Sequence, residues 1–307
     1  MRILVAGELN VDLILRGYCS FPAPGKEVLV DDLLLTLGSA SAICASGLAR
    51  LGNSVSFLGK IGPDLWGEFC LESMTAAGVD VSRVIRDSAI KTGMTVSLTS
   101  AGDRALVTYP GSIEALRLTD VPDGAFDRFN HLHVSSFYLQ KGLRSDMGAV
   151  FAAAANRGLT TSLDPGFDPA AVWGDDILDV LESVDLFFPN EVELRSITGC
   201  GEPLKSLQRL SNGRTLTVAK LGSAGCMALR EGQPVHVKAP EIEPLDTTGA
   251  GDSFDAGFLH TWLRGNPLEH AMRFAVACGA LSTRGLGGTG AQPRAEEAES
   301  FMTLGVL

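Results

Sequence analysis

After Pro122 the sequence alternates regularly between short apolar runs and longer segments with helical spacing. The apolar runs predict strands over residues 131–134, 160–163, 184–188, 216–219 and 226–230. The longer segments predict helices over residues 145–155, 191–197, 204–211, 253–263 and 268–283. Strands that are joined through helices lie parallel and are covered on both faces. The alternation therefore favours a three-layer α/β/α sandwich with a mostly parallel central sheet.

The first third of the chain fits the same architecture. Residues 2–6 predict a buried strand and residues 55–60 another, while the small-residue run 39–51 and the segment 65–77 predict helices. Residues 95–99 and 104–109 predict a hairpin around a turn-rich connection. At 307 residues the chain has room for up to about two domains, but α/β chains of this size often form one. We expect a single domain over 1–307.

The net charge and the cysteine pattern indicate which kinds of partner the protein can bind and in which cellular compartment it is expected. Lys plus Arg number 25 and Asp plus Glu 36, a net charge of −11, and the basic residues form no cluster. Such a chain is not expected to bind nucleic acid or an anionic membrane. The six cysteines form no CxxC pair, and the first residues read as a strand, not as a signal peptide. We expect a cytoplasmic protein with buried free thiols and no membrane span.

A turn of small residues at 249–251 opens into an apolar helix and carries the clearest chemistry. Gly249, Ala250 and Gly251 lack bulk, so their N–H groups can approach a ligand closely. At a helix N-terminus these unpaired donors form an anion site. Asp252 follows in the first turn, where it would accept a proton from a hydroxyl that attacks a phosphoryl group. The helix dipole alone also favours an Asp at this position, so the residue has a purely structural explanation as well.

A rival chemistry shares part of this stretch. The Gly-Asp-Ser block at 251–253, with a Gly at 257, spells the motif of GDSL-type esterases, in which Ser253 would be the nucleophile. That mechanism requires a later Asp-x-x-His to supply the base. The histidines that follow the block, His260 and His270, have no Asp three places before them. The esterase alternative is therefore poorly supported.

The longer string Asp-Thr-Thr-Gly-Ala-Gly-Asp-Ser-Phe-x-Ala-Gly-Phe, which starts at Asp246, resembles the C-terminal signature of the PfkB (ribokinase-like) carbohydrate kinases. The resemblance extends over nearly the whole chain. It implies an ATP-dependent sugar kinase, in which Asp252 is the general base and the Gly249–Gly251 amides form the anion hole. It also implies a small β-sheet lid, formed by about 11–37 and 93–110, over the substrate. A homodimer through this lid is a further expectation.

The resemblance places the acceptor beneath the lid. Asn10 and Asp12 share one side of an extended segment, and the Asp at this position of the family hydrogen-bonds sugar hydroxyls. Ser39 and Ile43 replace a Gly and an Asn of the family's N-terminal signature, and an Ile cannot hydrogen-bond a sugar, which argues against ribose-type contacts. Alone, Asn10 and Asp12 are better explained as solvated strand or turn residues. The candidate substrate-binding residues are Asn10, Asp12, Gly38, Ser39, Ile43, Arg104 and Tyr109.

The nucleotide and its metal are assigned to several later segments. Asn190 and Glu193 form a predicted capping box, and the family's Asn-x-x-Glu also organises Mg²⁺ and phosphates. Residues 220–225 resemble the family's nucleotide loop, although a plain hairpin turn explains their glycines equally well. The remaining candidates are Lys220, Gly222, Gly225 and Val276 for ATP, and Asp246 and Thr248 for a monovalent cation such as K⁺.

The sequence leaves the identity of the acceptor open. A sugar, a related polyol, a nucleoside or a sugar phosphate all fit these motifs. A protein of another class, a catalytically silent relative that binds a sugar or nucleoside as a sensor, also fits them, although the intact Asp252 and Gly249–Gly251 argue against it. Assay of the purified protein with ATP, Mg²⁺ and a sugar panel would separate these alternatives.

Overall fold

The computed structural model describes residues 1–18, 20–100 and 103–303, so Cys19 and the middle of the predicted hairpin turn lie outside the described residues. In the described part of the chain the main sheet has nine strands, of which β1, β4, β5 and β8–β11 run parallel. In spatial order the strands are β13 (Gln233–Val237), β12 (Cys226–Arg230), β11 (Leu216–Lys220), β10 (Leu186–Phe187), β9 (Thr160–Leu163), β8 (His131–Val134), β1 (Arg2–Ala6), β4 (Ser54–Ile61) and β5 (Asp80–Arg86). The predicted, mostly parallel sheet is confirmed.

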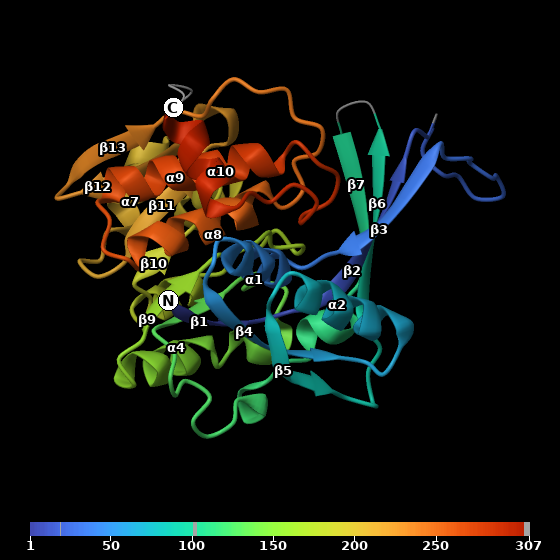
Figure 1. Cartoon of the computed structure of the whole chain (residues 1–307), viewed down its shortest axis with the longest axis horizontal. Coiled ribbons are helices and arrows are strands. Elements are labelled where there is room, and N and C mark those ends of the chain that lie inside the picture. Colours follow the sequence, from blue (N-terminus) through green and yellow to red (C-terminus); the bar gives the residue numbers. More distant parts are fainter. Residues whose placement is uncertain (19, 101–102, 304–307) are drawn as a thin grey trace.

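Helices cover both faces of this sheet (Figure 1), because alternate strand residues point to opposite sides and both sets are apolar. Ile3 and Val5 of β1 pack into one core, and Leu4 and Ala6 pack into the other. The first core is covered by α1 (Ala40–Arg50), α2 (Leu65–Ala76), α8 (Ala250–Trp262), α9 (Leu268–Ser282) and α10 (Ala295–Phe301). The second core is covered by α3 (Lys141–Arg144), α4 (Met147–Asn156), α5 (Asp176–Leu181), α6 (Glu191–Thr198) and α7 (Pro203–Leu210).

A second, smaller sheet stands apart from these layers (Figure 1). In the described residues it has four strands, in the order β3 (Asp32–Leu37), β2 (Asn10–Arg16), β6 (Gly93–Ser100) and β7 (Asp103–Tyr109). Strands β2 and β6 are parallel, and each pairs antiparallel with its outer neighbour. We call this four-stranded sheet the lid sheet. Its strands come from the two segments that the sequence assigned to a lid.

The helix that carries the predicted base starts earlier than the apolar spacing suggested. Gly249 adopts a left-handed φ of 72° as the N-cap, so α8 begins at Ala250 and Asp252 falls in its first turn. The sequence analysis did not predict β5, β13, α5 and α10, which are short elements at the edges of the fold. Within the described residues, no helix has the length and apolar character required to cross a bilayer.

The cysteines that the structure describes are unpaired. Cys44, Cys70, Cys226 and Cys278 are buried and Cys200 is partly exposed. Burial raises the pKa of the Cys70 and Cys226 thiols to about 12, which keeps them protonated and unreactive.

Candidate active site

A cleft of about 490 Å³ lies between the lid sheet and the carboxyl ends of the parallel strands. Ligands bind at this edge in open α/β sheets. The cleft joins residues that are more than 200 positions apart in the sequence, since Asp12 lines it from the lid sheet and Asp252 from α8. The predicted residues that line it are Asn10, Asp12, Ser39, Ile43, Asn190, Glu193, Lys220, Gly222, Thr248, Gly249, Gly251 and Asp252.

Other predicted residues lie near the cleft without lining it. A side chain at Gly38 would collide with Asp12 and Asn10, so this glycine lets β2 and the start of α1 approach each other closely. Ala250 is the first residue of α8. Both oxygens of Asp246 accept backbone N–H bonds, from Thr248 at 2.9 Å and from Gly287 at 2.8 Å, which holds two loops together.

Three further candidates lie on other surfaces or in the core. Tyr109 is 52% exposed, and Leu106 and Thr108 of the same strand line the cleft instead. Val276 is buried in the core on α9. Gly225 has a φ of 93° in the turn between β11 and β12, where any Cβ would collide with a backbone carbonyl, so the turn itself explains this glycine. The side chain of Arg104 lies outside the described part of the chain.

The N-terminal turn of α8 presents the small-residue turn and Asp252 to the cleft. Gly249 lies against Gly288 and Ile43, so a larger residue would have no space there. The pKa of Asp252 lies well above its usual range, first because the group is desolvated and next because Asp164 is close. Lys220 opposes this rise. A carboxylate with a raised pKa is a stronger base once it is ionised.

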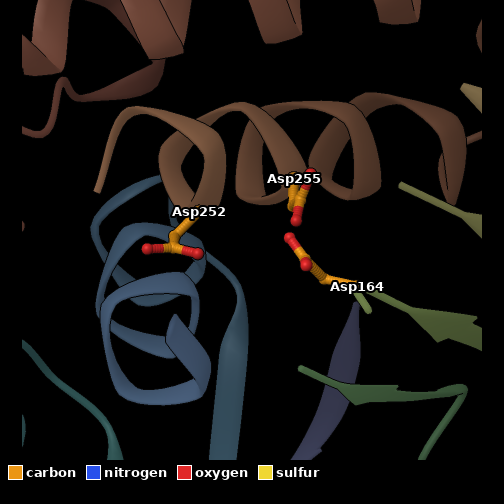
Figure 2. Close-up of side chains that lie close together, drawn as sticks. All are labelled: Asp164, Asp252 and Asp255. Carbon is orange, nitrogen blue, oxygen red and sulfur yellow. The ribbon is translucent and has the colours of Figure 1, made fainter. Parts of the chain in front are cut away.

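Beside Asp252, one turn further along α8, lies a buried group of charges that Figure 2 shows in part. The Lys220 ammonium lies 2.6 Å from Asp164 Oδ2 and 3.2 Å from each oxygen of Asp255. Carboxylate oxygens of Asp164, Asp252 and Asp255 lie within 4.8 Å of one another, a spacing that would suit a metal ion. The lysine supplies a cation at this position, so we interpret the cluster as a buried ion pair. Its carboxylates raise the pKa of Lys220.

Asn190 and Glu193 form the predicted capping box at the start of α6. The Asn190 side chain accepts from the Glu193 N–H at 2.9 Å, and the Asn190 N–H donates to Glu193 Oε2 at 2.8 Å. Glu193 is buried yet lines the cleft. Burial, followed by the charge of Asp164, raises its pKa to about 7. A nearby cation would offset both effects, so these oxygen ligands suit Mg²⁺.

Polar side chains line the part of the cleft next to the lid sheet. Asn10 Nδ2 donates to Asp12 Oδ1 at 3.0 Å, which holds the two side chains together. Ser39 has a left-handed φ of 72°, a conformation that favours glycine and explains the glycine of the family signature. The Ser39 hydroxyl donates to the Glu8 carbonyl at 2.5 Å and caps α1 by accepting from Ala42 N–H at 3.0 Å. These bonds offset the backbone strain.

Several residues of the site were missed by the sequence analysis. The carboxylate of Glu8 is buried at the end of β1 and accepts bonds from Ser41 and Ser136. Asp164 follows β9 in the same way, and both positions lie at the carboxyl edge that binds ligands. Gln292 links α1 to α8, because its amide donates to the Ile43 carbonyl at 2.9 Å and to Ser253 Oγ at 3.1 Å. No sequence signal pointed to this link.

Comparison with known proteins identifies the family. The family model for pfkB family carbohydrate kinases matches residues 1–295 of the chain. The chain belongs to this family. It is therefore a sugar kinase, a phosphotransferase with an alcohol group as acceptor, as the sequence resemblance implied.

Several relatives of this sugar kinase cover 95% or more of its length. It is 33% identical over 311 residues to a fructokinase of Klebsiella pneumoniae, covering 95% of this chain and 96% of the relative. It is 30% identical over 306 residues to an ATP-dependent ribose-1-phosphate kinase of Halopiger xanaduensis, covering 99% and 98%. Among solved structures, a double mutant of Vibrio cholerae fructokinase bound to fructose, ADP and potassium is similar with a TM-score of 0.80, 26% identity and 98% coverage of both chains.

Proposed function

We propose that this sugar kinase transfers the γ-phosphoryl of ATP to a hydroxyl of a small carbohydrate held near Asp12, with Asp252 as general base. The observation that supports this most strongly is the single cleft. It joins the Asn10–Asp12 pair, which suits sugar hydroxyls, to the α8 N-terminus, which suits a phosphoryl group.

The chemistry follows from these positions. The acceptor hydroxyl oxygen forms a bond to the γ-phosphorus while the bond from that phosphorus to the bridging oxygen of ADP breaks. The hydroxyl proton passes to the carboxylate of Asp252, and ADP leaves. The amides of Gly249 and Gly251 stabilise the negative charge on the transferring phosphoryl at the positive end of the helix, whereas the Ala250 N–H donates to the Thr247 carbonyl at 3.3 Å.

Asn190 and Glu193 would hold Mg²⁺ through its waters, and Gly222 lines the same end of the cleft, where the nucleotide would bind. Bound Mg²⁺ would neutralise charge on the ATP phosphates. Asp246 closes a loop with Thr248 and Gly287 whose backbone oxygens suit a monovalent cation, and the related fructokinase structure contains potassium. We include K⁺ in the proposal on this basis.

The test is ADP release by the purified protein with ATP, Mg²⁺ and a panel of neutral sugars, sugar phosphates and nucleosides, with and without K⁺. Turnover that depends on one acceptor class supports the proposal. Binding of a sugar without turnover would support the sensor alternative. The esterase alternative requires an accessible Ser253, but this residue is 2% exposed and bonded to Gln292. Ester hydrolysis lost in Ser253→Ala but kept in Asp252→Ala would revive it.

We also propose that the lid sheet forms a homodimer. One face of this sheet is apolar, since Leu13 lies in register with Leu35 and Val96, and Val96 with Val107. On this face Leu33 is 62% and Val107 63% exposed, which a second copy of the sheet would cover. Sedimentation of the wild type should give a dimer, and Val107→Glu should give a monomer. A wild-type monomer at all concentrations would contradict the proposal.

A further inference from the structure

Lys220 ends β11 and lines the floor of the cleft, and its ammonium is held by carboxylates. It contacts Asp164 on the loop after β9 and both oxygens of Asp255 on α8. The exposed fraction of the side chain is 11% for Lys220, 7% for Asp164 and 0% for Asp255. Removing one member would leave buried charge without a partner, so the three side chains form one unit.

This unit lies beside the turn that carries the proposed base. Asp255 follows Asp252 by three positions, so both side chains project from the same face of α8, as Figure 2 shows. A Cβ built on Gly251 would lie 3.4 Å from the Lys220 ammonium nitrogen. The ammonium therefore lies beside the turn that carries the proposed anion-binding amides, about a methyl group away from Gly251.

We propose that Lys220 is a positioning residue for phosphoryl transfer, held between Asp164 and Asp255 so that its charge balances theirs beside Asp252. The inference rests on the proposed role of Asp252 as general base. Lys220 then acts through Asp252 and not by binding the nucleotide, although its position in the sequence, at the start of a loop that resembles a nucleotide loop, suggested phosphate binding.

The direction of the electrostatic effect follows from the groups that face Asp252. Asp164, Glu8, Glu193 and Asp255 present carboxylates to it from four elements or loops, while Lys220 presents the opposing positive charge and Cys44 a protonated thiol. Loss of the Lys220 ammonium should make the Asp252 carboxyl group harder to ionise and so raise its pKa. Loss of the Asp164 charge should make the same group easier to ionise and so lower its pKa.

The experiment compares wild type, Lys220→Met and Asp164→Asn by the pH dependence of kcat/KM and by the KM for ATP. We expect the acid limb of kcat/KM to move up by about one pH unit in Lys220→Met and down in Asp164→Asn, because these changes shift the pKa of the base in opposite directions. The KM for ATP should stay within about twofold of wild type in Lys220→Met, because Lys220 makes no contact with ATP in this proposal.

Lys205→Met is the matched control, because this lysine pairs with Glu202 on the surface and is 69% exposed. Its profile should equal that of wild type. If Lys220→Met does not fold, Asp164→Asn alone tests the proposal, because Asn has the shape of Asp but no charge. A KM for ATP raised tenfold or more with an unmoved acid limb would overturn the inference and make Lys220 a phosphate ligand. An acid limb that persists unchanged in Asp252→Asn would remove the proposed base, and this inference with it.

Discussion

Asp252 combines two demands at one residue, since it must be ionised to accept a proton and yet lies among other carboxylates. Asp252→Asn keeps the size of the side chain but cannot take a proton. We expect kcat to fall by about 10²–10⁴-fold, the usual contribution of a general base, with little change in ATP affinity. Steady-state kinetics and nucleotide titration would measure both quantities.

Asp179→Asn provides the control for this prediction, because Asp179 is exposed and also lies in the first turn of a helix, α5. It should keep the wild-type kcat. A folded Asp252→Asn enzyme with wild-type kcat would exclude Asp252 as the base.

Ile43 is a packing residue at a position where the family resemblance implied a sugar-binding Asn. It lies against Gly249 and Gly288 and is 3% exposed. The double change Ile43→Asn with Ser39→Gly should improve kcat/KM for ribose-like acceptors if loss of the Asn shaped specificity. Thermal unfolding should show a loss of about 1–3 kcal/mol, because the packing of a buried apolar side chain is removed. Ser39→Gly alone is the control, and no gain with any pentose would assign specificity to the lid sheet.

At the scale of elements, the start of α6 has both a structural and a proposed catalytic role. In Glu193→Gln the amide can still accept the Asn190 N–H and maintain the capping box, but it carries no charge. We therefore expect a higher Mg²⁺ concentration for the half-maximal rate, with little change in the melting temperature.

The matched control for this change is Glu297→Gln, which lies in the capping box at the start of α10, with its carboxylate 2.6 Å from the Arg294 N–H. Its Mg²⁺ dependence should not change. If Glu193→Gln lowers only the melting temperature, Glu193 has a capping role alone.

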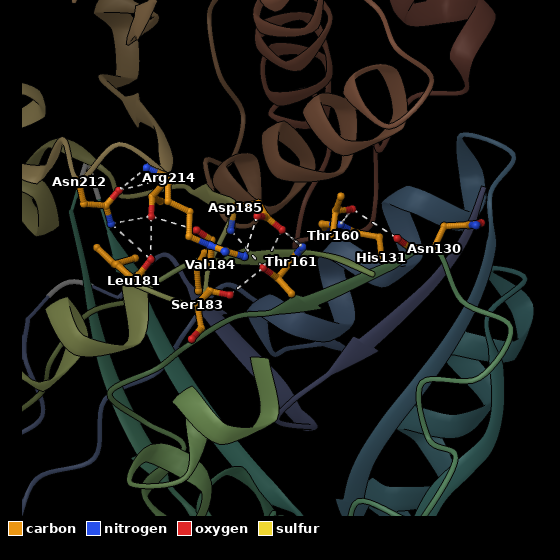
Figure 3. A network of polar contacts seen from close by, with 11 residues as sticks. Asn130, His131, Thr160, Thr161, Leu181, Ser183, Val184, Asp185, Asn212 and Arg214 are labelled. Carbon is orange, nitrogen blue, oxygen red and sulfur yellow. Dashed lines mark hydrogen bonds and ion pairs between the residues drawn. The ribbon is translucent and has the colours of Figure 1, made fainter. Parts of the chain in front are cut away.

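The strands β8 and β9 are joined by a buried chain of polar side chains. His131 lies between Thr160 and Ser162, and His133 lies between Ser162 and Ser135, with all four distances from 2.7 to 2.8 Å. Figure 3 shows the part of these contacts that lies at the amino ends of the two strands. There His131 and Thr160 lie near a second network, around Thr161 and Asp185. The network fixes the starts of the strands, opposite the cleft, so it contributes to stability and not to catalysis.

The buried histidines of this row of side chains predict that the folded protein loses stability in acid. Burial lowers the pKa of His133 to about 4 from 6.5, so between these values the unfolded state binds more protons than the folded state. The free energy of unfolding should therefore fall as the pH falls from about 6.5 towards 4. His133→Gln should make this fall less steep, as urea unfolding at several pH values would show. The exposed His236→Gln should not, and an equal slope in both variants would contradict the assignment.

At the scale of the whole molecule, the sequence predicted the layers and the helix after the small-residue turn well, because both depend on local patterns. The βα alternation predicts a parallel sheet, and the run from Asp246 to Phe258 predicts an anion-binding helix start. The charges beside Asp252 were not predicted, since Asp164, Lys220 and Asp255 come from three distant segments and only the folded sheet brings them together. The edge strand β5 was missed because its apolar residues do not alternate strictly with polar ones.

The interior position of β1 in the main sheet has a consequence for synthesis on the ribosome. This first strand lies between β4 and β8, so the early part of the chain can form one side of the sheet soon after it emerges. The lid sheet needs only residues up to Tyr109, whereas Asp252 is translated much later. A nascent chain can therefore complete the proposed sugar side of the cleft first, and it gains the proposed phosphoryl side only when α8 leaves the exit tunnel. Premature termination would give a protein that lacks α8 and the proposed base.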